Sequence, residues 1–482
     1  SSLAILGAVR DAVKKAGLDP AKIMKGDTIR YVVKVPTEPK ADVVIVGSGA
    51  AGLSAAVSAL QSGARRVALL EKAPLLGGHS ILSTGSVSVA FPDAETGARD
   101  ENIERFVRDT LEAGGPESDP ELVRLLAQKS YDAVIWLIQL GVRWNLEPFR
   151  AVSSTAVRNI STGSVRAGYD YVQTLLSAAK RLGVEIHYRT RAEALLTEAG
   201  RVTGVLARGP RGEALRFRAP AVVLATGGFT ANPVMRRRFD PRLHEGLRTT
   251  ANPEGQTLDG ATGDGIAMAE KIGAKTVGMS HIQLIPLIGG RVTDYAGAEV
   301  WVNARGERFV NEEERFGTLY EAILQQPDAR FWVITDSQSK KNATFGPKLA
   351  RGAVRAAANL EEVAQAMEIP EAKLRETLRR YNEAVDRNRD DLFGRTVFTQ
   401  RIDTPPYYFG EERFAVHFTC GGLAIDTHAR VLDRSGHPIP GLFAAGETTG
   451  GIHGKDRLGG NSLIDCFVFG RIAGEEAAAG RK

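Results

Sequence analysis

Cysteine is nearly absent from this chain of 482 residues, which contains only Cys420 and Cys466. Two cysteines do not make a disulfide framework. The sequence also has no C-x-x-C-H motif for a c-type haem, no ligand set for an iron–sulfur cluster and no other predicted metal site. If the protein carries out redox chemistry, we therefore expect an external electron donor or acceptor: a partner protein, a quinol or NAD(P)H.

Long apolar runs and clustered charge of one sign are also missing. No apolar stretch approaches the roughly 20 residues that a membrane-spanning helix needs, so no membrane span is predicted. The net charge is only +5, with 62 basic and 57 acidic residues interleaved. Because nucleic-acid-binding proteins concentrate their positive charge, we expect no nucleic-acid partner. We expect a cytoplasmic protein, or a periplasmic one if a signal peptide was removed before Ser1.

Glycine, by contrast, is abundant, and its spacing is most informative early in the chain. The β-branched run Val43–Val46 predicts a buried strand, and Gly47, Gly49 and Gly52 follow it as G-x-G-x-x-G. In this motif the first glycine allows a tight turn, the second lets backbone approach a pyrophosphate, and the third lets the next helix pack closely. A second predicted strand ends in Glu71, at the acidic position that binds a ribose hydroxyl. The stretch therefore predicts a dinucleotide site.

The glycine-rich composition of this first region is interrupted in the middle of the chain and then returns. It continues through ATGGF at 225–229, gives way to mixed helix and strand patterns, and reappears near residue 400. We predict a helical leader and linker over residues 1–40 and the first part of a dinucleotide-binding domain over 41–230. An inserted domain is predicted over 231–400, and the second part of the first domain over 401–482. The sequence suggests no function for the leader.

The glycine-rich C-terminal phrase carries a family resemblance. GLFAAGETTGGIHGKDRLGGNSLIDCFVFGR, together with GSGAAG and ATGGF, resembles the soluble fumarate reductase flavoproteins. That family also includes succinate dehydrogenase flavoprotein subunits and ketosteroid dehydrogenases. The resemblance covers most of residues 41–475. It implies an α/β fold in which a split Rossmann-like FAD-binding domain carries an inserted α+β capping domain, and it implies hydride transfer at flavin N5.

The resemblance implies three catalytic residues. His417, before F-T-C-G-G, matches the family's substrate-carboxylate histidine, and Arg457, in H-G-x-x-R-L-G-G-N, matches its carboxylate-binding arginine. Arg315 lies close to the family's proton-donating arginine, although its spacing from Phe309 is one residue shorter. A helix-surface charge is the alternative interpretation of Arg315, and Tyr320 would then be a second candidate proton donor.

The cofactor-binding residues are predicted from the fingerprint and the resemblance together. They are Gly47, Gly49, Gly52, Glu71, Lys72, Gly78, His79, Thr226, Gly227, Gly446, Glu447, Asn461, Ser462 and Leu463. We expect FAD to be bound non-covalently. A covalent link through His79 is the alternative, because the succinate dehydrogenase subunits carry a histidine there that is bonded to the flavin 8α carbon, where the non-covalent reductases carry asparagine.

The sequence departs from the family at the position that binds the far carboxylate of a dicarboxylate. The dicarboxylate enzymes of the family carry Q-x-H-P-T, and the histidine of this motif holds the far carboxylate. This chain has Gln283-Leu284-Ile285-Pro286-Leu287 at the same place. Apolar side chains at 285 and 287 cannot hold a second carboxylate, because burying an unpaired charge is costly. We therefore expect an FAD-dependent oxidoreductase that reduces or forms a C=C bond next to the carboxylate of a small acid other than fumarate. The alternative is a non-catalytic, flavin-holding subunit of a larger complex.

Overall fold

The computed structural model describes residues 38–480, apart from 152–153, 165, 244–245, 254, 256–258, 287–288, 294, 328–329 and 343. The helix and almost all of the connector predicted within residues 1–40 therefore lie outside the described residues. Leu287, the second apolar residue of the substituted motif, also lies outside them.

A six-stranded sheet forms the centre of the split domain. Its order is β19 (Arg430–Leu432), β20 (Pro438–Ala444), β10 (Ala221–Leu224), β1 (Val43–Val46), β2 (Val67–Leu70) and β6 (Glu185–His187). All neighbours are parallel except β19 and β20. Every residue of β1, β2 and β10 is buried, as expected for parallel strands covered on both faces. Because β20 pairs with β10, strands from both parts of the chain share one sheet, and the predicted split is confirmed.

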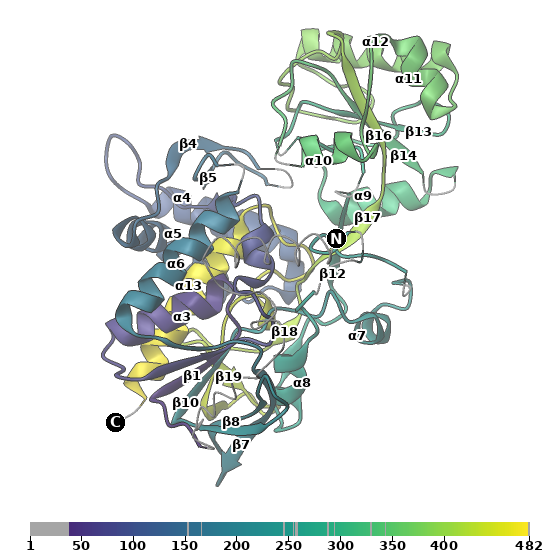
Figure 1. Cartoon of the computed structure of the whole chain (residues 1–482). Coiled ribbons are helices and arrows are strands. Elements are labelled where there is room, and N and C mark those ends of the chain that lie inside the picture. The colour runs from purple at the N-terminus through teal and green to yellow at the C-terminus, as the bar shows by residue number, and fades with distance from the viewer. Residues whose placement is uncertain are drawn as a thin grey trace, which may run out of the picture. The chain divides into compact units, whose positions relative to one another are not determined.

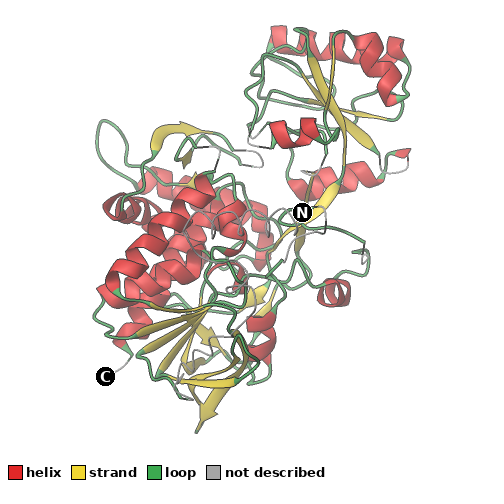
Figure 2. Cartoon of the chain, viewed as in Figure 1, coloured by secondary structure: helices red, strands yellow, loops and turns green. Residues whose placement is uncertain are grey.

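Helices cover one face of this sheet and a small sheet covers the other (Figures 1 and 2). The helices are α3 (Ala50–Gln61), α6 (Ala167–Leu182) and α13 (Asn461–Ala479), with α4 (Asp100–Gly114) and α5 (Pro120–Leu140) beside them. The small antiparallel sheet is β7 (Arg191–Glu198), β8 (Arg201–Arg208) and β9 (Ala214–Arg218). α13 and α3 approach closely through Gly474, where a Cβ atom would lie 2.3 Å from the carbonyl oxygen of Ala55.

The inserted cap is built on a four-stranded antiparallel sheet. Its order is β13 (Val300–Asn303), β14 (Phe331–Thr335), β16 (Tyr407–Glu412) and β15 (Arg355–Ala357). Successive side chains of a strand point to opposite faces. Val300 and Val302 accordingly join the cluster beneath α11 (Leu360–Met367) and α12 (Glu371–Arg387), whereas Trp301 joins the cluster beneath α9 (Phe316–Leu324).

The cap sheet extends beyond the domain boundary predicted at residue 401. β16 pairs with β14 and β15, so residues 407–412 belong to the cap sheet. The chain leaves it through β17 (Phe414–Thr419), which pairs with β12 (Ile282–Pro286). The domain boundaries stay predictions, and this pairing favours a cap that ends near residue 412.

Shorter elements complete the described part. They are β3 (Val87–Ser88), β4 (Asn145–Phe149), β5 (Asn159–Ser161), α7 (Pro233–Phe239), α8 (Asp264–Glu270), β11 (Thr276–Val277), β18 (Gly422–Leu423) and α10 (Phe345–Ala350). None of the helices in the described ranges is both long and apolar enough to cross a membrane.

Candidate active site

The predicted cofactor residues gather at the carboxyl ends of the parallel strands. Gly47 follows β1, Glu71 follows β2, Thr226 and Gly227 come shortly after β10, and Gly446 comes shortly after β20. In open parallel sheets, ligands bind in the crevice at this edge. The sheet order thus brings together residues that are almost 400 positions apart in the sequence.

Each of the three fingerprint glycines is needed at its position for a different structural reason. A Cβ atom on Gly47 would lie 2.1 Å from the carbonyl oxygen of Ala225, and one on Gly52 would lie 2.0 Å from the carbonyl oxygen of Gly47. A Cβ atom on Gly49 would meet nothing closer than Ser80 Oγ at 3.5 Å. Gly49 precedes the first turn of α3, which has neither a side-chain cap nor an acidic residue. The Ala50 amide donates to Ser80 Oγ at 3.0 Å, and the open space beside Gly49 fits the approach of the pyrophosphate of FAD to this helix start.

The second strand places Glu71 against the fingerprint loop. Its carboxylate accepts hydrogen bonds from the Ser48 hydroxyl at 2.5 Å and the Ala73 amide at 2.7 Å, so a ribose hydroxyl would share it with these donors. Lys72 points elsewhere. Its Nζ lies 2.9 Å from Asp264 at the start of α8, so the structure ties this predicted cofactor residue to another element of the protein.

The remaining cofactor residues border the same region. Gly78 lies against Gly49, with 3.8 Å between its Cβ position and the Gly49 Cα atom, and a Cβ atom on Gly227 would meet nothing within 4 Å. Glu447 accepts hydrogen bonds from the amide and hydroxyl of Thr419. The first turn of α13 carries Asn461, Ser462 and Leu463. The open space beside these glycines fits a bound flavin nucleotide.

His79 forms a contact that the sequence does not indicate. Its Nε2 lies 2.6 Å from Asp259 Oδ1, and the other oxygen of Asp259 accepts a hydrogen bond from Thr249. Burial disfavours the imidazolium form, but the hydrogen bond and charge of Asp259, with Glu447, outweigh it and raise the pKa of His79. Burial likewise opposes ionisation of Asp259, yet His79 lowers the pKa of Asp259 to about 2. The two side chains form an ion pair.

Arg457 is a buried cation with spare hydrogen-bond donors. Only 4% of its surface is exposed, and its guanidinium lies over the ring of Phe418. Nη1 donates to the Leu458 carbonyl at 2.9 Å and Nη2 donates to Gln283 Oε1 at 2.8 Å. Nε is buried without a partner, and burial lowers the pKa of Arg457. No carboxylate contacts this guanidinium within the described ranges, so the site is prepared to receive an anion.

His417 and Arg315 are the other two predicted catalytic residues. His417 Nδ1 is 2.8 Å from Thr250 Oγ1. Burial, Arg457 and His79 hold the pKa of His417 well below its usual range, so the imidazole is neutral. Arg315 is the N-cap residue of α9, and its Nη1 donates to the Glu112 carbonyl at 3.2 Å. It therefore lies at a helix end and not on a helix surface.

Comparisons with known proteins agree with this geometry. Residues 42–463 match the family described as FAD binding domain. The chain belongs to this family. It is 36% identical over 446 residues to a fumarate reductase (cytochrome) of Shewanella frigidimarina, covering 91% of this chain and 77% of the relative. It is 35% identical over 508 residues to a urocanate reductase of Eggerthella lenta, covering 99% and 81%.

Solved structures show the same architecture. The open conformation of a flavocytochrome c3 fumarate reductase superposes with a TM-score of 0.71 at 32% identity, covering 96% of this chain and 81% of that one. A 3-ketosteroid-Δ4-(5α)-dehydrogenase from Rhodococcus jostii RHA1 superposes with a TM-score of 0.70 at 28% identity, covering 91% and 97%. The family inferred from the C-terminal motifs is confirmed, and the protein is a flavin-dependent oxidoreductase of the fumarate-reductase-like type.

The substituted position of this FAD-binding family member lies in the cap core. Ile285 is only 5% exposed and packs in one cluster with Phe316 and Leu319 of α9. A register shift in the β12–β17 pairing falls between Gln283 and Leu284. Gln283 retains contact with the arginine of the site, whereas Ile285 offers no polar group.

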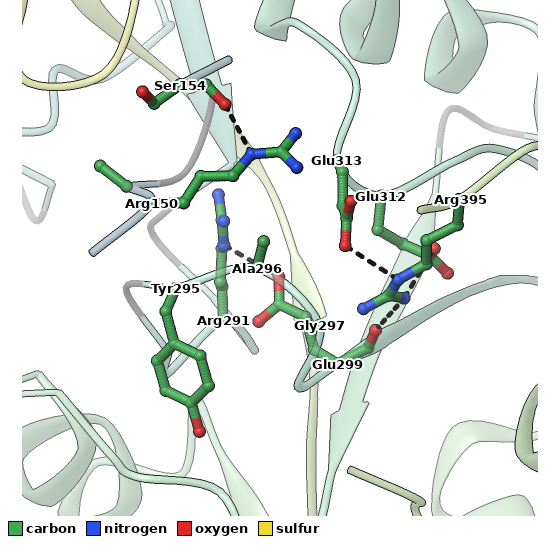
Figure 3. A pocket seen from close by; sticks show the side chains of 11 residues that line it. Arg150, Ser154, Arg291, Tyr295, Ala296, Gly297, Glu299, Glu312, Glu313 and Arg395 are labelled. Atoms are coloured by element: carbon green, nitrogen blue, oxygen red, sulfur yellow. Dashed lines mark hydrogen bonds and ion pairs between the residues drawn. The ribbon is translucent and has the colours of Figure 1, made fainter. Parts of the chain in front are cut away.

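A small cavity is lined by charged residues outside the predicted site set (Figure 3). Its lining includes Arg150, Arg291 and Arg395 together with Glu312 and Glu313. Arg395 pairs with Glu312 at 3.0 Å and with Glu313 at 3.1 Å. None of the lining residues was predicted to bind cofactor or substrate, and these pairs contribute to the interior of the cap.

Proposed function

We propose that this protein reduces, or in reverse forms, a C=C bond next to the carboxylate of a small organic acid, and that the acid carries one carboxylate and an apolar far end. The observation that carries the proposal is the buried guanidinium of Arg457, which has an unpaired Nε and no carboxylate contact within the described ranges. One planar carboxylate satisfies such a fork. Relatives named for fumarate, urocanate and acrylate support the reaction class.

The proposal gives each candidate side chain a role. Bound FAD, in its reduced form, would supply hydride chemistry at N5. Arg457 holds the carboxylate and stabilises the negative charge that develops on it, which is a preorganised electrostatic role. His417 adds a donor at Nε2, because the Thr250 hydroxyl can donate to Nδ1. Arg315, at the exposed start of α9, delivers the proton and regains it from solvent.

We propose that FAD is bound non-covalently. Nε2 of His79 is engaged by Asp259, so a bond from this nitrogen to the flavin would sacrifice the ion pair. Acid precipitation of the denatured protein tests the point, and we expect the yellow colour to stay in the supernatant. Colour that pellets with the wild type but not with His79→Asn would establish the covalent alternative.

We propose that electrons come from outside this chain. Relatives named fumarate reductase (cytochrome) and NADH:acrylate oxidoreductase support a cytochrome and NADH as candidate donors. Stopped-flow mixing with NADH, a quinol analogue and a reduced cytochrome separates these donors. Stoichiometric flavin reduction by NADH alone would identify NADH as sufficient.

The reaction itself is tested by reoxidation. The protein is reduced with dithionite and mixed with crotonate, cinnamate, urocanate or fumarate while flavin absorbance is followed. We expect rapid reoxidation by at least one acid with a single carboxylate. If no acid of the panel reoxidises the flavin, the non-catalytic alternative is favoured. If fumarate is the best oxidant, the proposed preference for acids with one carboxylate is wrong.

A further inference from the structure

A partly buried acid lies next to both candidate catalytic arginines. Asp456 is in the loop before α13, and its Oδ1 accepts a hydrogen bond from Gln283 Nε2 at 2.7 Å. Gln283 Oε1 accepts a hydrogen bond from Arg457 Nη2 at 2.8 Å, and Gln283 Nε2 also donates to the Arg457 carbonyl at 3.0 Å. The Gln283 amide therefore bridges the carboxylate of Asp456 and the guanidinium of Arg457, and its orientation is fixed.

The same carboxylate reaches the helix that begins beside the second arginine. A Cβ atom on Gly317, the second residue of α9, would lie 4.0 Å from Asp456 Oδ2. The N-cap residue, Arg315, makes no side-chain cap of its own. Asp456, in a loop of the FAD-binding domain, thus lies near the start of a helix of the cap domain, where a negative charge is favourable. Arg315 and Arg457 are the two cations whose charges act on it.

These contacts set the charge of the substrate region. Arg315 and Arg457 contribute two positive charges, and His417 is neutral. Burial raises the pKa of Asp456, the Gln283 hydrogen bond and the two arginines oppose that rise, and the ionised carboxylate contributes one negative charge. Glu447, the other carboxylate that acts on Arg457, already accepts two hydrogen bonds and is assigned to the cofactor. Arg315, Arg457 and Asp456 together carry one positive charge, which one substrate carboxylate neutralises. A second carboxylate would be buried beside a resident one, an arrangement in which like charges disfavour each other.

We propose that Asp456 is a specificity-determining residue. Its carboxylate contributes the negative charge that a second substrate carboxylate would otherwise contribute, and it therefore restricts the site to acids with one carboxylate. The inference rests on the proposed function and names a residue responsible for its substrate class. Neither the fingerprint nor the catalytic motifs indicated this role, because Asp456 was one of the unassigned positions in H-G-x-x-R.

The test compares a dicarboxylate with a monocarboxylate in binding and in turnover. Succinate and butyrate are titrated into the oxidised FAD-loaded protein, and their dissociation constants are read from the flavin difference spectrum. Fumarate and crotonate are compared by kcat/KM. We expect Asp456→Asn to raise the dicarboxylate-to-monocarboxylate ratio about tenfold in both assays, because a repulsion equivalent to about one pKa unit is removed. Asp456→Glu retains the charge and should keep the wild-type ratio.

Two further variants separate charge from packing. Glu117→Gln removes an acid that lies 3.6 Å from Lys455 in the neighbouring loop and should leave the ratio unchanged. Asp456→Ser, a second neutral variant, replaces Asp456→Asn if the latter does not fold with FAD. An unchanged ratio in a folded neutral variant, or equal shifts in the neutral variants and Asp456→Glu, would overturn the inference while the reaction class stands. A wild type that reduces no acid would instead overturn the proposed function.

Discussion

His79 and Asp259 meet at 2.6 Å although 180 positions separate them. The directions of their two pKa shifts define the pH range in which the pair stabilises the fold. The raised pKa of His79 gives stability that is present below pH 6.5 and is lost as the pH rises through the raised value. The lowered pKa of Asp259 gives stability that is present above pH 3.8 and is lost as the pH falls towards 2. The pair therefore contributes most between those two limits.

Asp259→Asn should lower the free energy of unfolding by about 2 kcal/mol near pH 5.5, since a buried charged hydrogen bond is lost. The difference from the wild type should shrink at pH 9, where His79 is neutral in both proteins. Urea titrations at the two pH values measure it. Asp391→Asn, which removes an exposed ion pair with Arg389, is the control and should change stability by under ~1 kcal/mol. An Asp259→Asn effect that is equal at both pH values would contradict the ion pair.

Gly49→Ala should abolish FAD binding without unfolding the apoprotein. The backbone of Gly49 has φ −66°, which any residue adopts, and its Cβ position is free of protein atoms to 3.5 Å. The added methyl group therefore costs the fold little but occupies the approach of a pyrophosphate. Gly47→Ala, whose Cβ would clash with Ala225, should lose both flavin and fold. Flavin absorbance and the melting temperature of each apoprotein distinguish the two effects, and full FAD content in Gly49→Ala would refute the placement.

The elements of the split domain were predictable because their signals are local. The run Val43–Val46 is buried and unbroken by polar residues, and the glycines that follow it have regular spacing. Arg457 was likewise marked by the glycine-dense flanks of the C-terminal phrase, and His417 by the F-T-C-G-G that follows it. Such features can be read because strand burial and tight turns constrain consecutive residues.

The partners of these side chains could not be predicted, because each comes from a distant element. Asp259 lies in the segment before α8 and Thr250 in the segment that pairs with β17, and neither has a motif. Lys72 was predicted to bind the cofactor, and nothing in the sequence indicated its pairing with Asp264. Long-range pairing depends on how the cap folds back towards the sheet, which spacing does not encode.

Thr250→Val should raise KM for the carboxylate substrate about fivefold with a smaller change in kcat. The hydroxyl lies 2.8 Å from His417 Nδ1, and losing one such hydrogen bond costs about 1 kcal/mol. Because the pKa of His417 is far below its usual range, kcat/KM should show no inflection near pH 6.5 from this residue in the wild type. Steady-state kinetics between pH 5.5 and 8.5 test both statements. A KM unchanged in Thr250→Val would mean that the hydroxyl does not orient His417 for binding.

Glu312→Gln should destabilise the cap by about 3 kcal/mol or more. Glu312 is buried between Arg308 at 2.8 Å and Arg395 at 3.0 Å, and Figure 3 shows the pairing with Arg395. Removing one member of a buried ionic cluster leaves the others without compensation. Glu361→Gln, on the exposed side of α11, is the matched control and should alter stability by under about 0.5 kcal/mol. Urea-induced unfolding followed by tryptophan fluorescence compares the two, and equal stability would contradict the ionic cluster.

Arg457→Lys should reduce turnover by at least about a hundredfold while flavin content stays near that of the wild type. Lysine keeps the positive charge but has no planar fork, so it cannot hold Gln283, the Leu458 carbonyl and a substrate carboxylate at once. Because Arg457 makes no contact with the fingerprint glycines in the described structure, FAD should still bind. Flavin absorbance per protein gives the content, and reoxidation of the reduced flavin by the best acid of the panel gives the turnover. Parallel loss of both quantities would assign Arg457 to the cofactor or the fold, whereas loss of turnover alone supports its role in holding the substrate carboxylate.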